Sequence, residues 1–239
     1  MFRNPQEKQE ILSRLEPTRV YENVISDDLL NKLISFYESS EKIYKTTGPV
    51  SVEYMPYSGI YKHKHDTWWL ELDSIITDKI GDHGLFATNF FEVTQPHIIH
   101  NDDSVNKKPR LYKTVVIPIR ISKPTKFAVF DQCYLDGPIK VRHGSELKAD
   151  KPRYYNDNLL DNSVLEYYTG IDFDKKIWAD NFTHQPYIRY HGLSVESIVT
   201  WKPGDIIVFD TARLHCAADF KAQGIEKKLG YSVFTQLEK

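Results

Sequence analysis

The stretch Gly204–His215 reads GDIIVFDTARLH, and it indicates the type of fold more clearly than any other part of the sequence. The run Pro-Gly-Asp at 203–205 is typical of a turn. The four consecutive apolar residues 206–209 predict a buried strand. A short connection then leads to His215, which stands among small and apolar residues. The stretch therefore predicts a turn, a buried strand and a partly buried histidine just beyond it.

Other runs of the strand type recur from Gly84 to the C-terminus, and helical patterns precede them. Strands are expected where β-branched and aromatic residues gather between turn residues, at 85–93, 111–121, 126–132, 193–201, 205–210 and 229–237. Helices are expected over 5–15, 26–42 and 66–84. Strands of this kind close into a sandwich or jelly roll. The predicted fold class is mainly β with N-terminal helices (α+β), with a jelly-roll or cupin-like core.

The length of 239 residues suits one large domain. We expect a single domain, 1–239, with a helical support at 1–84 and a jelly-roll core formed by 85–133 and 193–239. The segment 134–192 interrupts the strand series, is rich in tyrosine and is longer than an ordinary loop. It is therefore interpreted as an insertion that could cover a site as a lid.

Composition excludes few functions but sets some expectations. The 31 Lys and Arg residues against 33 Asp and Glu give a net charge of −2, so a nucleic acid or an acidic membrane surface is not expected as a partner. No apolar run approaches the roughly 18 residues of a membrane span, and the N-terminus lacks the apolar segment of a signal peptide. The two distant cysteines form no zinc pattern, which favours a reducing compartment. We expect a cytoplasmic protein.

The stretch His97–Asp103, HIIHNDD, carries the strongest chemical signal. Side chains two residues apart in a strand point the same way, so His100 and Asp102 are expected to share a face and His97 to point to the other. With His215 as a third ligand, they would form the two-histidine, one-carboxylate triad of non-haem Fe(II) oxygenases. The alternative is that these are ordinary surface or core polar residues. The hypothesis requires the two imidazoles to lie within roughly 6 Å, because metal–nitrogen bonds are about 2 Å long.

A co-substrate such as 2-oxoglutarate would need one further feature, a buried cation that pairs with its distal carboxylate. Lys228 begins the last predicted strand and could supply this charge, and Tyr231 or Ser232 could add a hydroxyl. Lys227 competes for the role. Strand alternation sends the two lysines to opposite faces, so only one can point inward.

The order His100-x-Asp102, then PGDIIVFDTARLH ending at His215, then Lys228 with LGYSVFT resembles the Fe(II)/2-oxoglutarate-dependent dioxygenases. The similarity covers roughly residues 85–237 and is greatest to the prolyl-hydroxylase-like branch, although most members have Arg where Lys228 stands. It implies a double-stranded β-helix with iron at its open end.

The resemblance also implies a set of site residues and a reaction. His100, Asp102 and His215 would hold Fe(II), and 2-oxoglutarate would be bound by Lys228 with contacts from Tyr112, Thr114 and Ser232. With O2 as the oxidant, the enzyme would hydroxylate a C–H bond of a small molecule or a protein side chain and release succinate and CO2.

Other residues and other functions stay open. Arg142, His143 and Tyr190 in the insertion are candidates for substrate contacts, whereas Asp103 and the histidines of HKH at 63–65 are not expected to bind metal. The first alternative function is a cupin-type metal enzyme that has the same ligands but does not use 2-oxoglutarate. The second is a jelly-roll binding module without catalysis.

Overall fold

The structure is a computed structural model that describes residues 5–40, 44–46, 52–54, 66–102, 111–135, 140–141, 154–156, 159–160 and 173–237. Its helices are α1 (Pro5–Ser13), α2 (Asp27–Ser39), α4 (Thr67–Ile80), α5 (Lys175–Asn181) and the 3-10 helix η3 (Tyr187–Tyr190). Its strands are β1 (Arg19–Tyr21), β2 (Tyr44–Thr46), β3 (Val52–Tyr54), β4 (Gly84–Val93), β5 (Leu111–Ile121), β6 (Thr125–Cys133), β7 (Lys140–Val141), β8 (Tyr154–Asn156), β9 (Leu159–Leu160), β10 (Val195–Trp201), β11 (Ile206–Asp210), β12 (Arg213–Ala217) and β13 (Lys228–Gln236).

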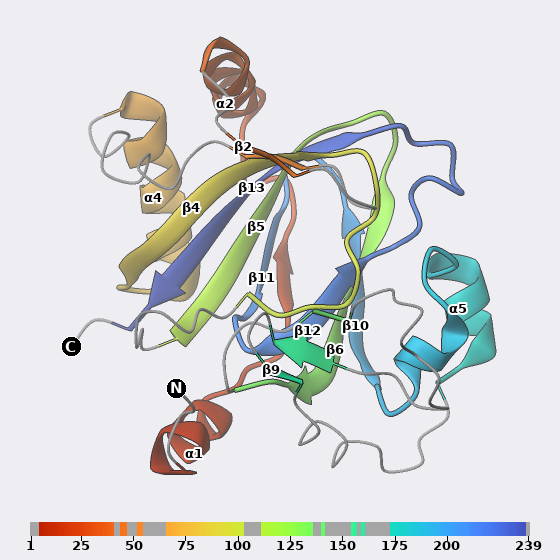
Figure 1. Cartoon of the computed structure of the whole chain (residues 1–239). Coiled ribbons are helices and arrows are strands. Elements are labelled where there is room, and N and C mark those ends of the chain that lie inside the picture. The colour runs from red at the N-terminus through yellow and green to blue at the C-terminus, as the bar shows by residue number, and fades with distance from the viewer. Residues whose placement is uncertain are drawn as a thin grey trace.

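Two antiparallel sheets form the centre of the molecule (Figure 1). The major sheet has seven strands in the order β1-β11-β5-β13-β4-β3-β2, and the minor sheet has three in the order β10-β6-β12. A further three-stranded sheet has the order β7-β8-β9. The prediction of a mainly β protein with N-terminal helices is confirmed.

Helices α2 and α4 cover one face of the major sheet (Figure 1). Helix α2 begins where the sequence predicts, because the hydroxyl of Ser26 accepts a hydrogen bond from the Leu29 amide at 3.1 Å. Helix α4 ends at Ile80, followed by Gly81 with a φ of 79°, which few residues other than glycine adopt. Buried apolar residues of both helices pack on alternate residues of the strands, including Leu33, Leu72, Val115, Ile117, Val208 and Tyr231.

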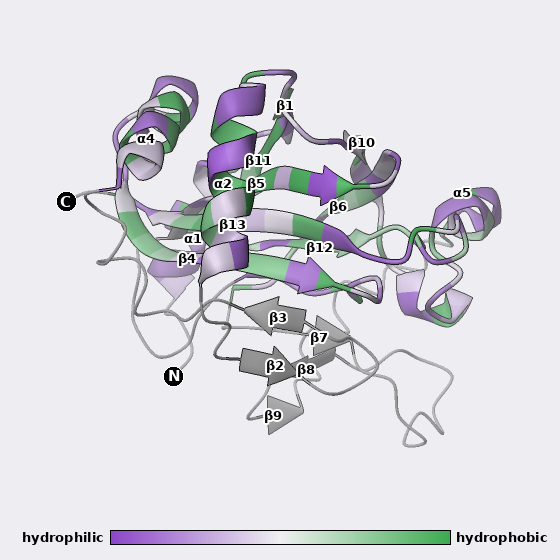
Figure 2. Ribbon diagram, turned by 90° about the horizontal axis from the view of Figure 1, so that it is seen from above, coloured by the Kyte–Doolittle hydropathy of each residue, from purple (hydrophilic) through white to green (hydrophobic). Residues whose placement is uncertain are grey.

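The opposite face of the major sheet packs against the minor sheet. Ile207 and Phe209 of β11 lie in this inner cluster, whereas Ile206 and Val208 lie in the helical cluster. Both faces of β11 are therefore buried, which explains why its sequence is a continuous apolar run rather than an alternating one. The ribbon coloured by hydropathy shows hydrophobic segments among the strands at the centre of the molecule (Figure 2).

The outer face of the minor sheet is covered by α5 and η3. Phe173, Phe182 and Tyr190 pack there with Phe130 and Leu214 of the sheet. The part of the predicted insertion at 173–192 is therefore structural cover for this sheet. The expectation of a lid concerns the remainder of the insertion, most of which lies outside the described residues.

Strand β12 was not predicted, because the sequence was interpreted as a connection between β11 and His215. The turn between β11 and β12 contains only Thr211 and Ala212, neither of which is a typical turn residue. It nevertheless carries the chain from the major sheet to the minor sheet. Within the described residues, no helix has the length and apolar character that a membrane crossing requires.

Gly230 of β13 allows a close contact that a larger residue would prevent. A Cβ atom at this position would lie 2.5 Å from the Phe91 ring, on the face of β13 opposite the buried Leu229 and Tyr231. We therefore expect Gly230→Ala to lower the free energy of unfolding by about 1–3 kcal/mol through overpacking, as measured by urea denaturation.

Gly84→Ala is a matched control, because the added Cβ would meet the flexible side chain of Gln236 at 3.0 Å. The control should lose clearly less stability. Equal losses in the two variants would show that the contact with Phe91 is not the cause.

Candidate metal centre

The segment between β4 and β5 runs antiparallel to β12 and extends the minor sheet. The His100 amide donates to the His215 carbonyl at 3.0 Å, and the His215 amide donates to the His100 carbonyl at 2.8 Å. On either side, the Asp102 amide donates to the Thr211 carbonyl at 3.3 Å and the Ala217 amide donates to the His97 carbonyl at 3.3 Å. These backbone bonds bring together two stretches that are more than a hundred positions apart in the sequence.

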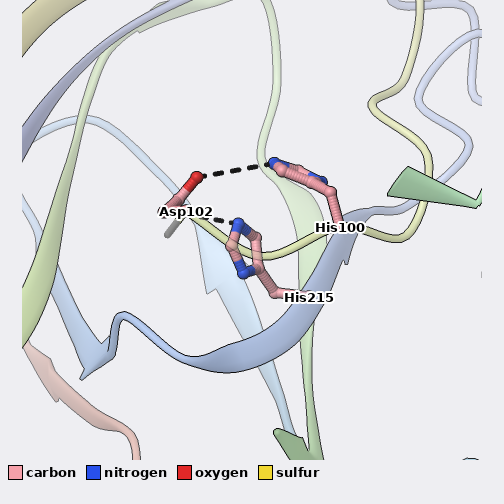
Figure 3. A group of neighbouring side chains, drawn as sticks. All are labelled: His100, Asp102 and His215. Carbon is pink, nitrogen blue, oxygen red and sulfur yellow. Dashed lines mark ion pairs between the residues drawn. The ribbon is translucent and has the colours of Figure 1, made fainter. Parts of the chain in front are cut away.

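Three side chains converge at this pairing (Figure 3). The ring centroids of His100 and His215 are 4.2 Å apart, well within the separation that a shared metal requires. The Asp102 carboxylate lies 3.7 Å from His100 Nε2 and 3.3 Å from His215 Nε2. Neighbouring ligands of an octahedral ion with bonds of about 2.1 Å would lie about 3 Å apart. His100, Asp102 and His215 could therefore hold a metal ion with small adjustments.

Backbone carbonyls fix the orientation of both imidazoles. His100 Nδ1 lies 2.7 Å from the Ile98 carbonyl, and His215 Nδ1 lies 3.0 Å from the Arg213 carbonyl. A carbonyl only accepts, so each Nδ1 must carry a proton, and in a neutral imidazole Nε2 then presents its lone pair toward Asp102. Two lone pairs and a carboxylate that face one another form a donor set suited to a cation.

Burial keeps His215 neutral. Its side chain is only 4% exposed, and desolvation lowers its pKa to about 4, partly opposed by the bond to the Arg213 carbonyl. The rings of Phe209 and Phe127 lie 4.6 and 5.5 Å from the imidazole. At neutral pH this nitrogen can coordinate a metal without first losing a proton.

Lys228 is buried in the space between the sheets. It is 3% exposed, and its Nζ lies 4.4 Å from the Trp201 ring centroid and 5.5 Å from that of Phe220. This ammonium makes no hydrogen bond or ion pair with any residue that the structure describes, and burial lowers its pKa to about 7. Lys227 instead has a side chain that is 54% exposed and bonds to Glu92. Of the two lysines that competed in the sequence, Lys228 is the one that points inward.

No protein-family model matches the sequence, and no curated protein matches it. Solved structures match in fold. The non-heme alpha ketoglutarate dependent epimerase SnoN from nogalamycin biosynthesis matches with a TM-score of 0.54 and 12% identity, over 98% of this chain and 84% of that chain. The structure of SnoN in complex with Fe3+, alpha ketoglutarate and nogalamycin RO matches with a TM-score of 0.52 and 13% identity. The match covers 98% of this chain and 85% of that chain. A Pseudomonas putida prolyl-4-hydroxylase matches with a TM-score of 0.39 and 9% identity, over 96% of this chain and 97% of that chain.

This chain has the fold of the Fe(II)/2-oxoglutarate-dependent oxygenases. The predicted resemblance is thus confirmed at the level of the fold.

Within this oxygenase fold, the predicted hydroxyl groups divide between the two faces of the major sheet. Thr114 lies on the inner face, where its hydroxyl is 3.2 Å from that of Thr211, and Ser232 pairs with Val116 of the inner cluster. Tyr112 does not reach this space, because its hydroxyl donates to the Ile80 carbonyl at the end of α4. The expected contact between Tyr112 and a co-substrate is therefore not supported by the structure.

The residues predicted to contact substrate are not brought to the triad of His100, Asp102 and His215. Tyr190 is fully buried on the outer face of the minor sheet, where Gln185 Nε2 donates to its hydroxyl at 2.9 Å. Its aromatic ring completes the packing beneath α5, so it is not available to a substrate. Arg142 and His143 lie outside the described residues.

His97 lies closer to the triad of His100, Asp102 and His215 than strand alternation predicts. The chain bends at Ile99, and the His97 ring centroid is consequently 5.4 Å from that of His100. The aromatic residues Trp201 and Phe220, which the sequence pattern did not single out, lie beside Lys228. Nothing local to either residue reveals this contact, because they belong to distant segments that meet only in the folded chain.

Removal of a triad member should abolish tight metal binding. Loss of a group that only orients a metal ligand typically weakens metal binding roughly 10–100-fold. We expect Asp102→Asn and His215→Ala to weaken Co(II) or Mn(II) binding by more than this, because each removes a ligand itself. The affinities would be measured by anaerobic titration calorimetry.

His83→Ala is the matched control, because His83 lies beyond the end of α4 beside Asp73 and should leave the affinity unchanged. Wild-type affinity in both triad variants would show that the ion binds elsewhere.

Proposed function

We propose that the protein is an Fe(II)- and 2-oxoglutarate-dependent oxygenase, with His100, Asp102 and His215 as iron ligands. The observation that carries this proposal is the buried ammonium of Lys228, which has no hydrogen-bond or ion-pair partner among the described residues and lies in the interior of the fold that also holds the triad. A metal triad alone would suit several enzyme classes. The additional buried cation favours a co-substrate with a carboxylate.

The donor set favours iron of the non-haem type. Two neutral imidazoles and one carboxylate leave three positions of an octahedral ion open. These positions would accept the two chelating oxygens of 2-oxoglutarate and O2. The Asp102 carboxylate also supplies a negative charge that partly balances the ion in a site with little access to water.

Lys228 supplies the complementary charge for the distal carboxylate. An isolated buried ammonium is unfavourable, and contact with the faces of Trp201 and Phe220 offsets only part of its lost hydration. A bound carboxylate would provide the missing ion pair and hydrogen bond. We place the hydroxyls of Thr114 and Ser232 along the same pocket, because both lie on the inner face of the major sheet.

We interpret the two facing antiparallel sheets as a double-stranded β-helix. Residues 1–84 would support the major sheet, and 85–133 with 193–239 would form the core around the metal. Most of the segment 134–192, which the sequence predicts as a lid, lies outside the described residues.

The reaction that fits this site is hydroxylation of an unactivated C–H bond in a small molecule or a protein side chain. Bound iron with 2-oxoglutarate and O2 supplies the oxidant, and succinate and CO2 are the co-products. The protein holds the three ligands in place, and the rings of Phe127 and Phe209 exclude water from the His215 side of the site. Lys228 fixes the far end of the co-substrate.

Turnover can be tested without knowing the substrate. The wild-type protein with Fe(II), O2 and 2-oxoglutarate should release succinate slowly, and faster when a screened compound is a substrate. Asp102→Ala should abolish this release. Full activity of Asp102→Ala would contradict its role as an iron ligand.

Lys228→Met should weaken 2-oxoglutarate binding by about 10–100-fold, in line with the roughly 1.5–3 kcal/mol typical of a hydrogen bond to a charged group. The measurement is calorimetry on the Mn(II)-loaded protein. Lys227→Met removes a neighbouring lysine that is exposed, so it should bind 2-oxoglutarate as the wild type does.

Unchanged 2-oxoglutarate binding in Lys228→Met, with metal binding intact, would instead favour a cupin-type enzyme that does not use this co-substrate.

Binding of 2-oxoglutarate should be linked to proton uptake. Burial places the pKa of Lys228 near 7 in the free protein, and a bound carboxylate would raise it. Above pH 7 the free lysine loses its proton, so the apparent affinity should fall by up to about tenfold per pH unit. Below pH 7 the lysine is already charged and the dependence should disappear.

Calorimetry at pH 8 in two buffers with different ionisation enthalpies should detect close to one proton taken up by the wild type and none by Lys228→Met. Absence of uptake in the wild type would show that Lys228 is not the group that pairs with the co-substrate.

A further inference from the structure

The short turn between β11 and β12, together with Arg213 at the start of β12, contacts two of the three proposed ligands. The Thr211 carbonyl accepts the Asp102 amide at 3.3 Å, and the Arg213 carbonyl accepts Nδ1 of His215 at 3.0 Å. The position of the carboxylate and the rotation of one imidazole therefore both depend on the conformation of this turn. His100 is oriented separately, by the Ile98 carbonyl.

A cluster of charged side chains holds Asp210, the last residue of β11, directly before the turn. The Asp210 carboxylate, in a residue that is 5% exposed, accepts from Lys113 Nζ at 2.8 Å and from the Glu16 amide at 2.7 Å. Arg213 Nε lies 3.9 Å from the same carboxylate. Lys113 Nζ also lies 3.0 Å from the Glu16 carboxylate, and this contact lowers the pKa of Glu16.

The four residues, which we name the Asp210 cluster, come from three separate parts of the chain. Glu16 lies between α1 and β1, Lys113 is in β5, and Asp210 and Arg213 flank the turn. Two positive and two negative charges balance one another. Because an uncompensated buried charge is strongly unfavourable, the cluster restricts the turn to the arrangement in which all of these contacts are made.

We propose that the Asp210 cluster positions the metal ligands Asp102 and His215, an inference that rests on the proposed function. None of the contacts described for its four side chains is with a triad side chain, so these residues act through the backbone of the turn. Ligands of a metal site must be held to within about half an ångström of the productive geometry. Loosening of the turn should therefore reduce metal affinity before it unfolds the protein.

Asp210→Asn is the principal test, because it keeps the size of the side chain and removes its charge. Co(II) affinity should fall about 10–100-fold, the range typical of losing a group that orients metal ligands. The visible spectrum of bound Co(II) should also change, because it reports ligand geometry rather than stability. Glu16→Gln should show a smaller change in the same direction, since the Glu16 side chain is 46% exposed. Lys113→Arg keeps the charge and should retain more affinity than Lys113→Met.

Arg120→Met is the matched control. Arg120 lies toward the other end of β5 and pairs with Glu38 and Glu92, so its loss removes an ion pair of the same strand without touching the turn. This variant should bind Co(II) as the wild type does, with the same spectrum. Thermal unfolding of every variant separates loss of stability from loss of metal binding.

The outcomes are distinguishable. A wild-type protein that binds no metal would overturn the proposed function and this inference with it. A wild type that binds metal, with unchanged affinity and spectrum in Asp210→Asn and Glu16→Gln, would overturn the inference alone. An equal loss of affinity in Arg120→Met would also overturn it. Should Asp210→Asn not fold, Glu16→Gln decides the question, because that residue is half exposed.

Discussion

The reciprocal backbone hydrogen bonds between His100 and His215 are the constraint on which the candidate centre depends. They join the segment after β4 to β12, so the minor sheet gains an edge that the assigned strands alone do not include. Directly opposed residues of antiparallel strands have their side chains on the same face and close together. Two imidazoles are thus placed against one another by the backbone, and Asp102 follows two residues later on the same side.

The interior between the sheets combines two features that are both unfavourable without a ligand. At one place the Asp102 carboxylate faces two imidazole lone pairs, and at another an ammonium is enclosed by aromatic rings. The carboxylate is partly buried and the ammonium is buried, and a group of opposite charge would stabilise each of them. A metal ion with a chelating dicarboxylate would satisfy both, which is why the proposed function explains more of the interior than metal binding alone.

Regular elements were predictable because their causes are local. The apolar stripe of α2 with Ser26 as its cap, the run of 111–121 in β5 and the two-sided burial of 206–209 each follow from adjacent residues. Strand β12 was missed because it begins without a typical turn residue. Tyr112 and Tyr190 were assigned to the wrong surroundings, since residue type alone does not tell which face of a sheet a side chain occupies when the strand is irregular or the residue lies in a loop.

The sequence by itself determined the types of elements, their order along the chain and the set of candidate residues for binding a metal and a carboxylate. It did so because capping, periodicity and ligand chemistry depend on residues that are near in sequence or on side-chain type. Only the tertiary structure decided that His97 lies beside His100, that Lys228 rather than Lys227 points inward, and that the backbone at 211–213 contacts two residues of the triad. These outcomes depend on how distant strands pair and on a single bend at Ile99, and neither is set by neighbouring residues alone.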